Sequence, residues 1–225
     1  MAVLTVDNVT KQKGKYRILK GICFKVERGE IVGFIGANGA GKTTTMKCIM
    51  DLCSYGGNID TDGVGMEKIS ALIEEPSFYK NMSGKENLEI NRLYYNDVDS
   101  DRCDELIKSL EMEKYIDRKV KHYSLGMKQR LGLAIALLNN PDILLLDEPM
   151  NGLDPDGVMQ LRNLLGRLAH EEKKAILVSS HILAEMQNLC DRAIFIKDGI
   201  IVGEEEPLSN LEQRYIQIMG REENV

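Results

Sequence analysis

GANGAGKT, residues 36–43, matches the pattern G-x-x-x-x-G-K-[ST] of a phosphate-binding loop. An apolar run, EIVGFI, precedes it and a segment with apolar residues at helical spacing follows, so the motif lies between a predicted strand and a predicted helix. In such a loop the backbone N–H groups surround phosphate oxygens, Lys42 reaches the β and γ oxygens, and Thr43 offers its hydroxyl to Mg²⁺. The alternative, a glycine-rich turn with a chance lysine, does not explain this context. The predicted nucleotide-binding residues of the loop are Gly36, Asn38, Gly39, Ala40, Gly41, Lys42, Thr43 and Thr44.

Two further apolar runs end in polar residues. ILLLDEP, residues 143–149, ends in two carboxylates, and AILVSSH, residues 175–181, ends in a histidine. Such runs are typical of parallel strands in an α/β sheet, where ligands bind at the carboxyl ends of the strands. We expect Asp147 to hold Mg²⁺, directly or through water, Glu148 to act as general base on the attacking water, and His181 to contact the γ-phosphate. Without the phosphate-binding loop, a solvated turn and a surface histidine would be the better interpretations.

The remaining patterns predict the elements around this sheet. Alternating segments at residues 2–10 and 18–26 predict a small antiparallel layer, while SYGGNIDTDGVG, residues 54–65, predicts a turn-rich connection. Residues 82–123 are highly charged and helical in pattern, which indicates a small helical subdomain. Near the end of the chain, AIFIK and GIIVG predict a hairpin, and LEQRYIQIM predicts a short closing helix.

A second anion site is indicated by YSLGMKQRL, residues 123–131. Ser124 precedes a segment that continues apolar at helical spacing, so Ser124 is the predicted N-cap and Gly126 lies in the first turn. The start of a helix offers free N–H groups and a positive dipole end to an anion. This stretch therefore predicts an anion site in addition to the phosphate-binding loop.

The composition disfavours several classes of protein. The net charge of −6 is spread along the chain, and no basic run is interleaved with aromatic residues, which argues against nucleic acid as a partner. No segment approaches the ~18 apolar residues that cross a bilayer, and the start of the chain lacks a secretory signal, so we expect a cytosolic protein. The cysteines form no CxxC pair and have apolar neighbours, which predicts buried reduced thiols: Cys23, Cys48, Cys53, Cys103 and Cys190.

The motifs GANGAGKTT, YSLGMKQRL, LLLDEP, NGLDP and SSH, in this order over nearly the whole chain, resemble the nucleotide-binding subunit of an ABC transporter. The resemblance implies an α/β fold with a RecA-like P-loop NTPase core, an antiparallel β layer and a helical subdomain. It implies one domain over residues 1–225, in which residues 1–73 and 126–225 form the β layer and the core. Residues from about 74 to 125 would form the helical subdomain, with the signature motif at its end. The implied activity is hydrolysis of MgATP to power a separate permease, at the cytoplasmic face of a membrane.

The signature motif of the family is usually LSGGQ, and YSLGM stands in register with it. Ser124 and Gly126 match, whereas Leu125 replaces a glycine and Met127 replaces the glutamine. The resemblance implies that Ser124 and Gly126 contact the γ-phosphate held by a second chain, identical or pseudo-symmetric, in a head-to-tail dimer. NGLDP resembles the D-loop, which implies that Asp154 crosses the dimer seam. As the residue before a proline, Asp154 is equally a good helix N-cap.

Two other positions depart from the family pattern. Glu74 stands where the family has a glutamine that links Mg²⁺ and water to the helical subdomain. A carboxylate still binds Mg²⁺. It adds negative charge beside the γ-phosphate, so hydrolysis could be slower or more dependent on a partner. The aromatic residue that stacks on adenine is replaced by Lys13, and Tyr16 is the nearest candidate. Its alternative role is that of a strand residue packed on the β layer.

A longer stretch, residues 72–88, carries a resemblance to a subgroup. LIEEPSFYKNMSGKENL looks like the subgroup that serves bacitracin and lantibiotic resistance or immunity exporters, through Pro76 and the aromatic pair Phe78 and Tyr79. Exposed aromatic residues here would suit docking of a permease. Two alternatives remain open: a soluble ABC-type ATPase that acts on the ribosome or nucleic acid, and an ATP-binding switch with little turnover.

Overall fold

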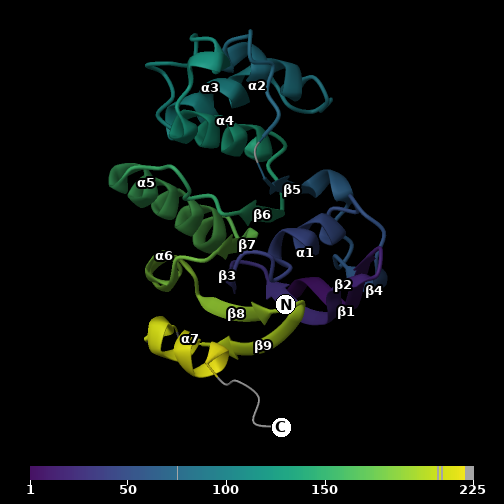
Figure 1. Ribbon diagram of the computed structural model, residues 1–225. Helices are drawn as coiled ribbons and strands as arrows, with labels where there is room; N and C mark the ends of the chain where they lie inside the picture. The colour runs from purple at the N-terminus through teal and green to yellow at the C-terminus, as the bar shows by residue number, and fades with distance from the viewer. Residues whose placement is uncertain (75, 207, 209, 221–225) are drawn as a thin grey trace.

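A six-stranded sheet forms the centre of the computed structural model, which describes residues 1–74, 76–206, 208 and 210–220 (Figure 1). Its strand order is β5-β6-β7-β3-β8-β9, and neighbouring strands are parallel except for the β8–β9 hairpin. The strands are β3 Ile31–Ile35, β5 Ile69–Leu72, β6 Ile143–Asp147, β7 Ala175–Ser180, β8 Arg192–Lys197 and β9 Ile200–Glu205. The parallel strands and the closing hairpin confirm the sequence prediction.

The sheet separates two hydrophobic cores, which explains why its strands are apolar on both faces. In β6, Leu144 and Leu146 pack into the first core, which also contains residues of helices α2 to α6, within residues 84–189. Ile143 and Leu145, on the other face of the strand, pack into the second core. The second core also contains helix α1, Lys42–Ile49, and one face of the antiparallel layer. Both faces of the strand are thus covered, as a parallel sheet requires.

An antiparallel sheet of order β2-β1-β4 covers α1 from outside, in agreement with the predicted layer. Its strands are β1 Ala2–Lys13, β2 Tyr16–Glu27 and β4 Gly56–Asp60. The prediction that residues 54–65 only connect elements is wrong, because β4 lies within them and pairs Ile59 with Val6. The glycine, asparagine and aspartate residues of this edge strand are typical of turns, so its sequence did not predict a strand. Backbone pairing with β1, rather than an apolar pattern, stabilises it.

Helices α2 Gly84–Arg92, α3 Ser100–Ser109 and α4 Leu125–Leu137 form a separate layer at one end of the molecule (Figure 1). There α4 packs against α2, α3 and β5. Capping fixes their starts: Ser83 and Glu86 form a reciprocal capping box on α2, and Asp99 caps α3. The α-helices outside this layer are, besides α1, α5 Pro155–Gly166, α6 Leu183–Leu189 and α7 Leu211–Met219. Shorter helices are η1 Met66–Lys68, η2 Val120–His122 and the π-helical η3 Arg167–Glu171.

Within the described part of the chain, none of the helices has both the length and the apolar character required to cross a membrane. The cysteine prediction is confirmed for three buried thiols, Cys48, Cys103 and Cys190, while Cys53 is partly exposed. It is wrong for Cys23, which is exposed. Side chains alternate along β2, so Ile22 and Phe24 face the core and Cys23 between them faces solvent.

Candidate functional site

The phosphate-binding loop joins the end of β3 to the start of α1. Gly39 and Gly41 have φ of 83° and 115°, the left-handed region that favours glycine. A Cβ atom on Gly36 would lie 2.3 Å from the Ile196 carbonyl oxygen, and one on Gly41 would lie 2.8 Å from Leu19 Cδ2. The loop therefore passes between β8 and β2 at positions where a side chain would not fit.

Lys42 folds back along this loop. Its side chain is 5% exposed, and Nζ donates hydrogen bonds to the carbonyl oxygens of Gly36 at 2.6 Å and Ala37 at 3.3 Å. The buried ammonium group also lies 3.5 Å from Glu148 Oε1. A cation in this position is placed to bind the phosphate that the loop would surround.

Asp147 ends β6 beside the first turn of α1. Thr43 Oγ1 donates to Asp147 Oδ2 at 2.5 Å, and Ser179 Oγ donates to the other carboxylate oxygen, Oδ1. The hydroxyl and carboxylate oxygens form the hard oxygen donor set that Mg²⁺ prefers. Ser179 is fully buried, and the sequence reasoning missed it. Its position two residues before His181, at the end of a strand, was the available signal.

Glu148 adopts φ of 51° directly after Asp147. Its backbone N–H donates to the carbonyl oxygen and to Oγ of Ser179, both at 3.1 Å. Its carboxylate lies 2.9 Å from His181 Nδ1 and, on the other side, near Lys42. The three residues that we expected to be catalytic are thus brought together: Lys42 begins α1, Glu148 follows β6 and His181 follows β7.

Glu74 lies across a groove from this cluster. With Asp147 and Glu148 it lines a groove of about 340 Å³ between the helical layer and the core. Glu74 Oε1 accepts a hydrogen bond from Lys47 Nζ at 2.6 Å, with the two side chains 61% and 34% exposed. Lys47, in the last turn of α1, was not singled out from the sequence, because nothing there links it to Glu74.

The predicted second anion site lies at the start of α4. Ser124 Oγ accepts from the Met127 backbone N–H at 3.2 Å, and Met127 Sδ lies 3.5 Å from the Ser124 nitrogen. The predicted N-cap is confirmed, and the methionine sulfur takes the place of the usual polar partner in a capping box.

The D-loop segment packs against this helix start. Asp154 Oδ1 accepts from the Gly157 backbone N–H at 2.9 Å, which confirms its role as N-cap of α5 with Pro155 in the first turn. Ser124, Gly126 and Asp154 line one groove of about 500 Å³. The structure therefore brings the predicted signature and D-loop residues to one surface.

Residues 19–151 match the sequence pattern of the family described as ABC transporter. The chain belongs to the ABC transporter family. It is 39% identical to the lantibiotic transport ATP-binding protein SrtF of Streptococcus pyogenes over 91% of both chains. It is 37% identical to the bacitracin transport ATP-binding protein BcrA of Enterococcus faecalis, over 94% of this chain and 71% of BcrA.

The fold of this ABC ATPase is shared with solved cassettes. The dimeric ATP-binding cassette MJ0796, solved in a post-hydrolysis state with ADP and Pi, is 27% identical and has a TM-score of 0.81, over 90% of this chain and 98% of that chain. The likeness confirms the predicted ABC ATPase fold. The family also confirms the predicted use of ATP as substrate.

Tyr16 begins β2 of the ABC ATPase, opposite Lys13. Its side chain is 66% exposed, and Lys15 Nζ lies 5.6 Å from the centre of its ring. The alternative that Tyr16 packs on the β layer is wrong, since most of its surface faces solvent. The ring is free to stack on a ligand, and its contact with adenine stays a prediction.

Glu185 on α6 is a further acidic group of the site that the sequence did not indicate. Its Oε2 atom is buried and has no hydrogen-bond partner among the described residues. Burial raises the pKa of the Glu185 carboxyl, and the nearby charge of Glu148 raises it further. The ABC ATPase thus carries a carboxyl oxygen near Glu148 that, among the described residues, has no hydrogen-bond partner.

Proposed function

We propose that this ABC ATPase subunit binds MgATP, closes head to tail with a second copy or a pseudo-symmetric partner, and hydrolyses ATP to power a separate membrane permease. The observation that carries this proposal is the convergence of Lys42, Glu148 and His181 beside the phosphate-binding loop. We propose one domain over residues 1–225, with residues 1–73 and 126–225 as β layer and core and residues from about 74 to 125 as helical subdomain, against which α4 packs beyond that boundary. The subunit would act at the cytoplasmic face of the membrane, through its permease.

The Mg²⁺ of the substrate would be held by Thr43 and Asp147, with Glu74 as a third candidate. Support comes from the direct contact between the Thr43 hydroxyl and the Asp147 carboxylate, an oxygen pair of the type that binds Mg²⁺. When bound, the ion neutralises charge on the β and γ phosphate oxygens. The second oxygen of Asp147 is held by Ser179, which fixes the orientation of the carboxylate.

Three side chains would have separate roles in the hydrolysis of ATP. Glu148 accepts a proton from the attacking water, and His181, 2.9 Å from its carboxylate, holds that carboxylate in place. Lys42 and the loop N–H groups stabilise the charge that develops on the transferred phosphoryl group. Because Lys42 contacts loop carbonyl oxygens and Glu148, a γ-phosphate would compete with both for the ammonium group. ATP binding would thereby release Glu148 for proton transfer.

The groove lined by Ser124, Gly126 and Asp154, here called the second groove, would receive the γ-phosphate of the partner's ATP. The start of α4 offers N–H groups to an anion, and Ser124 and Gly126 line the same groove as Asp154. The solved relative with ADP and Pi is a dimer. Loss of the γ-phosphate would remove contacts to both chains and favour opening.

The cargo we propose is an antimicrobial peptide, moved outward. The class of cargo is supported by the names of the relatives, which describe bacitracin and lantibiotic transport. The outward direction is supported by the resemblance of residues 72–88 to the exporter subgroup. The permease would dock near residues 76–80, where Tyr79 is 55% exposed.

The solution mass of Glu148→Gln with and without MgATP tests this function. Blocking proton transfer should trap a dimer only when MgATP is present. Adding Ser124→Arg, which fills the second groove with a long cation, should restore the monomer without weakening ATP binding at the loop. A monomer at saturating MgATP in the Glu148→Gln protein would contradict the head-to-tail arrangement.

A further inference from the structure

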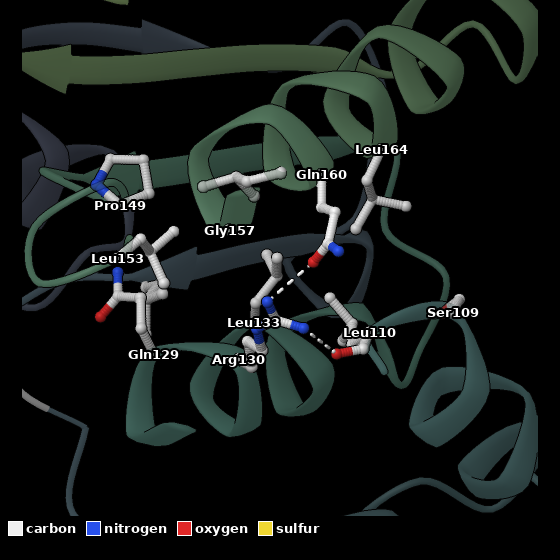
Figure 2. A pocket seen from close by; sticks show the side chains of 12 residues that line it. Ser109, Leu110, Gln129, Arg130, Leu133, Pro149, Leu153, Gly157, Gln160 and Leu164 are labelled. Atoms are coloured by element: carbon white, nitrogen blue, oxygen red, sulfur yellow. Dashed lines mark hydrogen bonds between the residues drawn. The ribbon is translucent and has the colours of Figure 1, made fainter. Parts of the chain in front are cut away.

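Helices α4 and α5 carry the two halves of the second groove. The first residues of α4 follow Ser124, and those of α5 follow Asp154, so the relative placement of the helices decides how far apart these residues lie. Figure 2 shows the slot between the helices, where leucine side chains from both elements meet. Apolar contacts of this kind are not directional, so they hold the helices together without fixing how far one is displaced along the other.

Arg130 spans this slot with directional bonds. Its Nη1 donates to the Leu110 carbonyl oxygen at 2.9 Å and its Nη2 donates to Gln160 Oε1 at 2.7 Å, the dashed lines in Figure 2. Gln160 in turn donates to Glu111 Oε2 at 2.8 Å, and that carboxylate lies 3.7 Å from Arg130 Nη1. The guanidinium group thus links the end of α3, the middle of α4 and the first half of α5.

The arginine is also seated against the first turn of α5. A Cβ atom on Gly157 would lie 3.5 Å from Arg130 Nη2, and the Gly157 N–H is the group that Asp154 caps. The Arg130 side chain is 22% exposed, so its bonds are partly shielded from water. At the other side of the groove, a Cβ on Gly126 would lie 3.2 Å from the Gly152 carbonyl oxygen, which leaves little space for the two segments to shift.

We propose that Arg130 is a positioning residue, which fixes the signature helix α4 against α5 so that Ser124 and Asp154 are presented together to the nucleotide of the partner. The inference rests on the proposed head-to-tail dimer. It places Arg130 outside the chemistry of the chain's own loop, since its contacts lie on α3, α4 and α5. Arg130 should therefore affect closure of the dimer and leave ATP binding by the monomer unchanged.

The test compares variants in the Glu148→Gln protein with MgATP as the probe. Arg130→Met should raise the dimer dissociation constant by about tenfold or more, because two acceptors in a partly buried slot lose their donor. The affinity of the monomer for MgATP, measured below the concentration of dimerisation, should stay the same. Gln160→Leu should also weaken the dimer, and the double variant should be no weaker than Arg130→Met alone.

Arg102→Met is the matched control. Arg102 donates from Nη2 to the Leu137 carbonyl oxygen at 3.0 Å, so it holds the opposite end of α4. Arg102→Met should lower the melting temperature about as much as Arg130→Met does. It should leave the dimer dissociation constant unchanged. Equal weakening of the dimer by both arginine variants, or no weakening by Arg130→Met, would overturn the inference. Failure of the parent Glu148→Gln protein to dimerise would instead count against the proposed function.

Discussion

Replacing Glu74 with glutamine should keep or raise the rate of ATP hydrolysis. Glu74 shares a groove with Asp147 and Glu148, so the exchange removes one of three negative charges near the place where the γ-phosphate would bind. Glutamine has nearly the same shape and still offers an oxygen. The exchange also releases Lys47, whose ammonium group now contacts Glu74.

The size of the effect follows from the exposure of the Lys47–Glu74 pair. At 2.6 Å the pair is close, but the side chains are 34% and 61% exposed. An exposed pair contributes about 0.2–1 kcal/mol, which corresponds to a factor of about 1.4 to 5 in an equilibrium constant. We therefore expect Lys47→Met to weaken MgATP binding by a factor in this range when Glu74 is present, because the carboxylate then repels the phosphates without a neutralising cation.

A double-mutant cycle measures this coupling directly. MgATP affinity and phosphate release would be determined for wild type, Glu74→Gln, Lys47→Met and the double variant, at low and high salt. The coupling should appear at low salt and diminish at high salt. Complete loss of hydrolysis in Glu74→Gln would refute the reasoning, since it would show that the carboxylate itself is required.

Three further predictions concern the catalytic cluster. Lys42→Ala should abolish phosphate release and weaken ATP binding, because the buried cation of the loop is lost, and normal turnover in this variant would contradict its role. Ser179→Ala should lower the free energy of unfolding, measured in denaturant titrations, by about 1–3 kcal/mol, and it should slow hydrolysis. The reason is that the Asp147 carboxylate and the Glu148 N–H both lose their hydrogen bond to the buried Ser179 hydroxyl. An unchanged stability and rate would show that the serine hydroxyl is dispensable. Glu185→Gln should raise the melting temperature at neutral pH, because the folded-state pKa of Glu185 is raised and its ionisation opposes folding above the ordinary pKa of 4.5. That gain should shrink as the pH falls toward this value, and a gain that is constant with pH would argue against ionisation as the cause.

The catalytic residues could be predicted because each follows a short local pattern. Lys42 and Thr43 belong to a contiguous motif, and Asp147 and His181 end apolar strands whose polar ends meet in a parallel sheet. Strand β4 escaped prediction because its stability comes from pairing with β1, which no local apolar pattern records. Ser179 was missed for a related reason, since its partners belong to β6 and only the assembled sheet brings them near.

Two other features depend on long-range contacts in the same way. Lys47 meets Glu74 27 positions later in the chain, and Arg130 meets Gln160 30 positions later. Charged and amide side chains at such separations have many possible partners, so only the packing of the helices selects one. The motif residues could therefore be predicted from the sequence, whereas the residues that orient them could not.

The sequence of strand β6 determines how the carboxylates of Asp147 and Glu148 are placed at its end. Its residues 143–146 are all apolar and divide between two cores, and a carboxylate bounds the run at each end, Asp142 before it and Asp147 after it. A displacement by one residue would move one of these carboxylates into a position that is now buried in a core, which is strongly unfavourable. Bonds at the two ends support the same register, from the Asp142 N–H to the Lys68 carbonyl oxygen at 2.8 Å and from the Glu148 N–H to Ser179. The requirement that keeps charge out of the two cores therefore also decides which carboxylate ends the strand beside Thr43 and which one follows it beside His181.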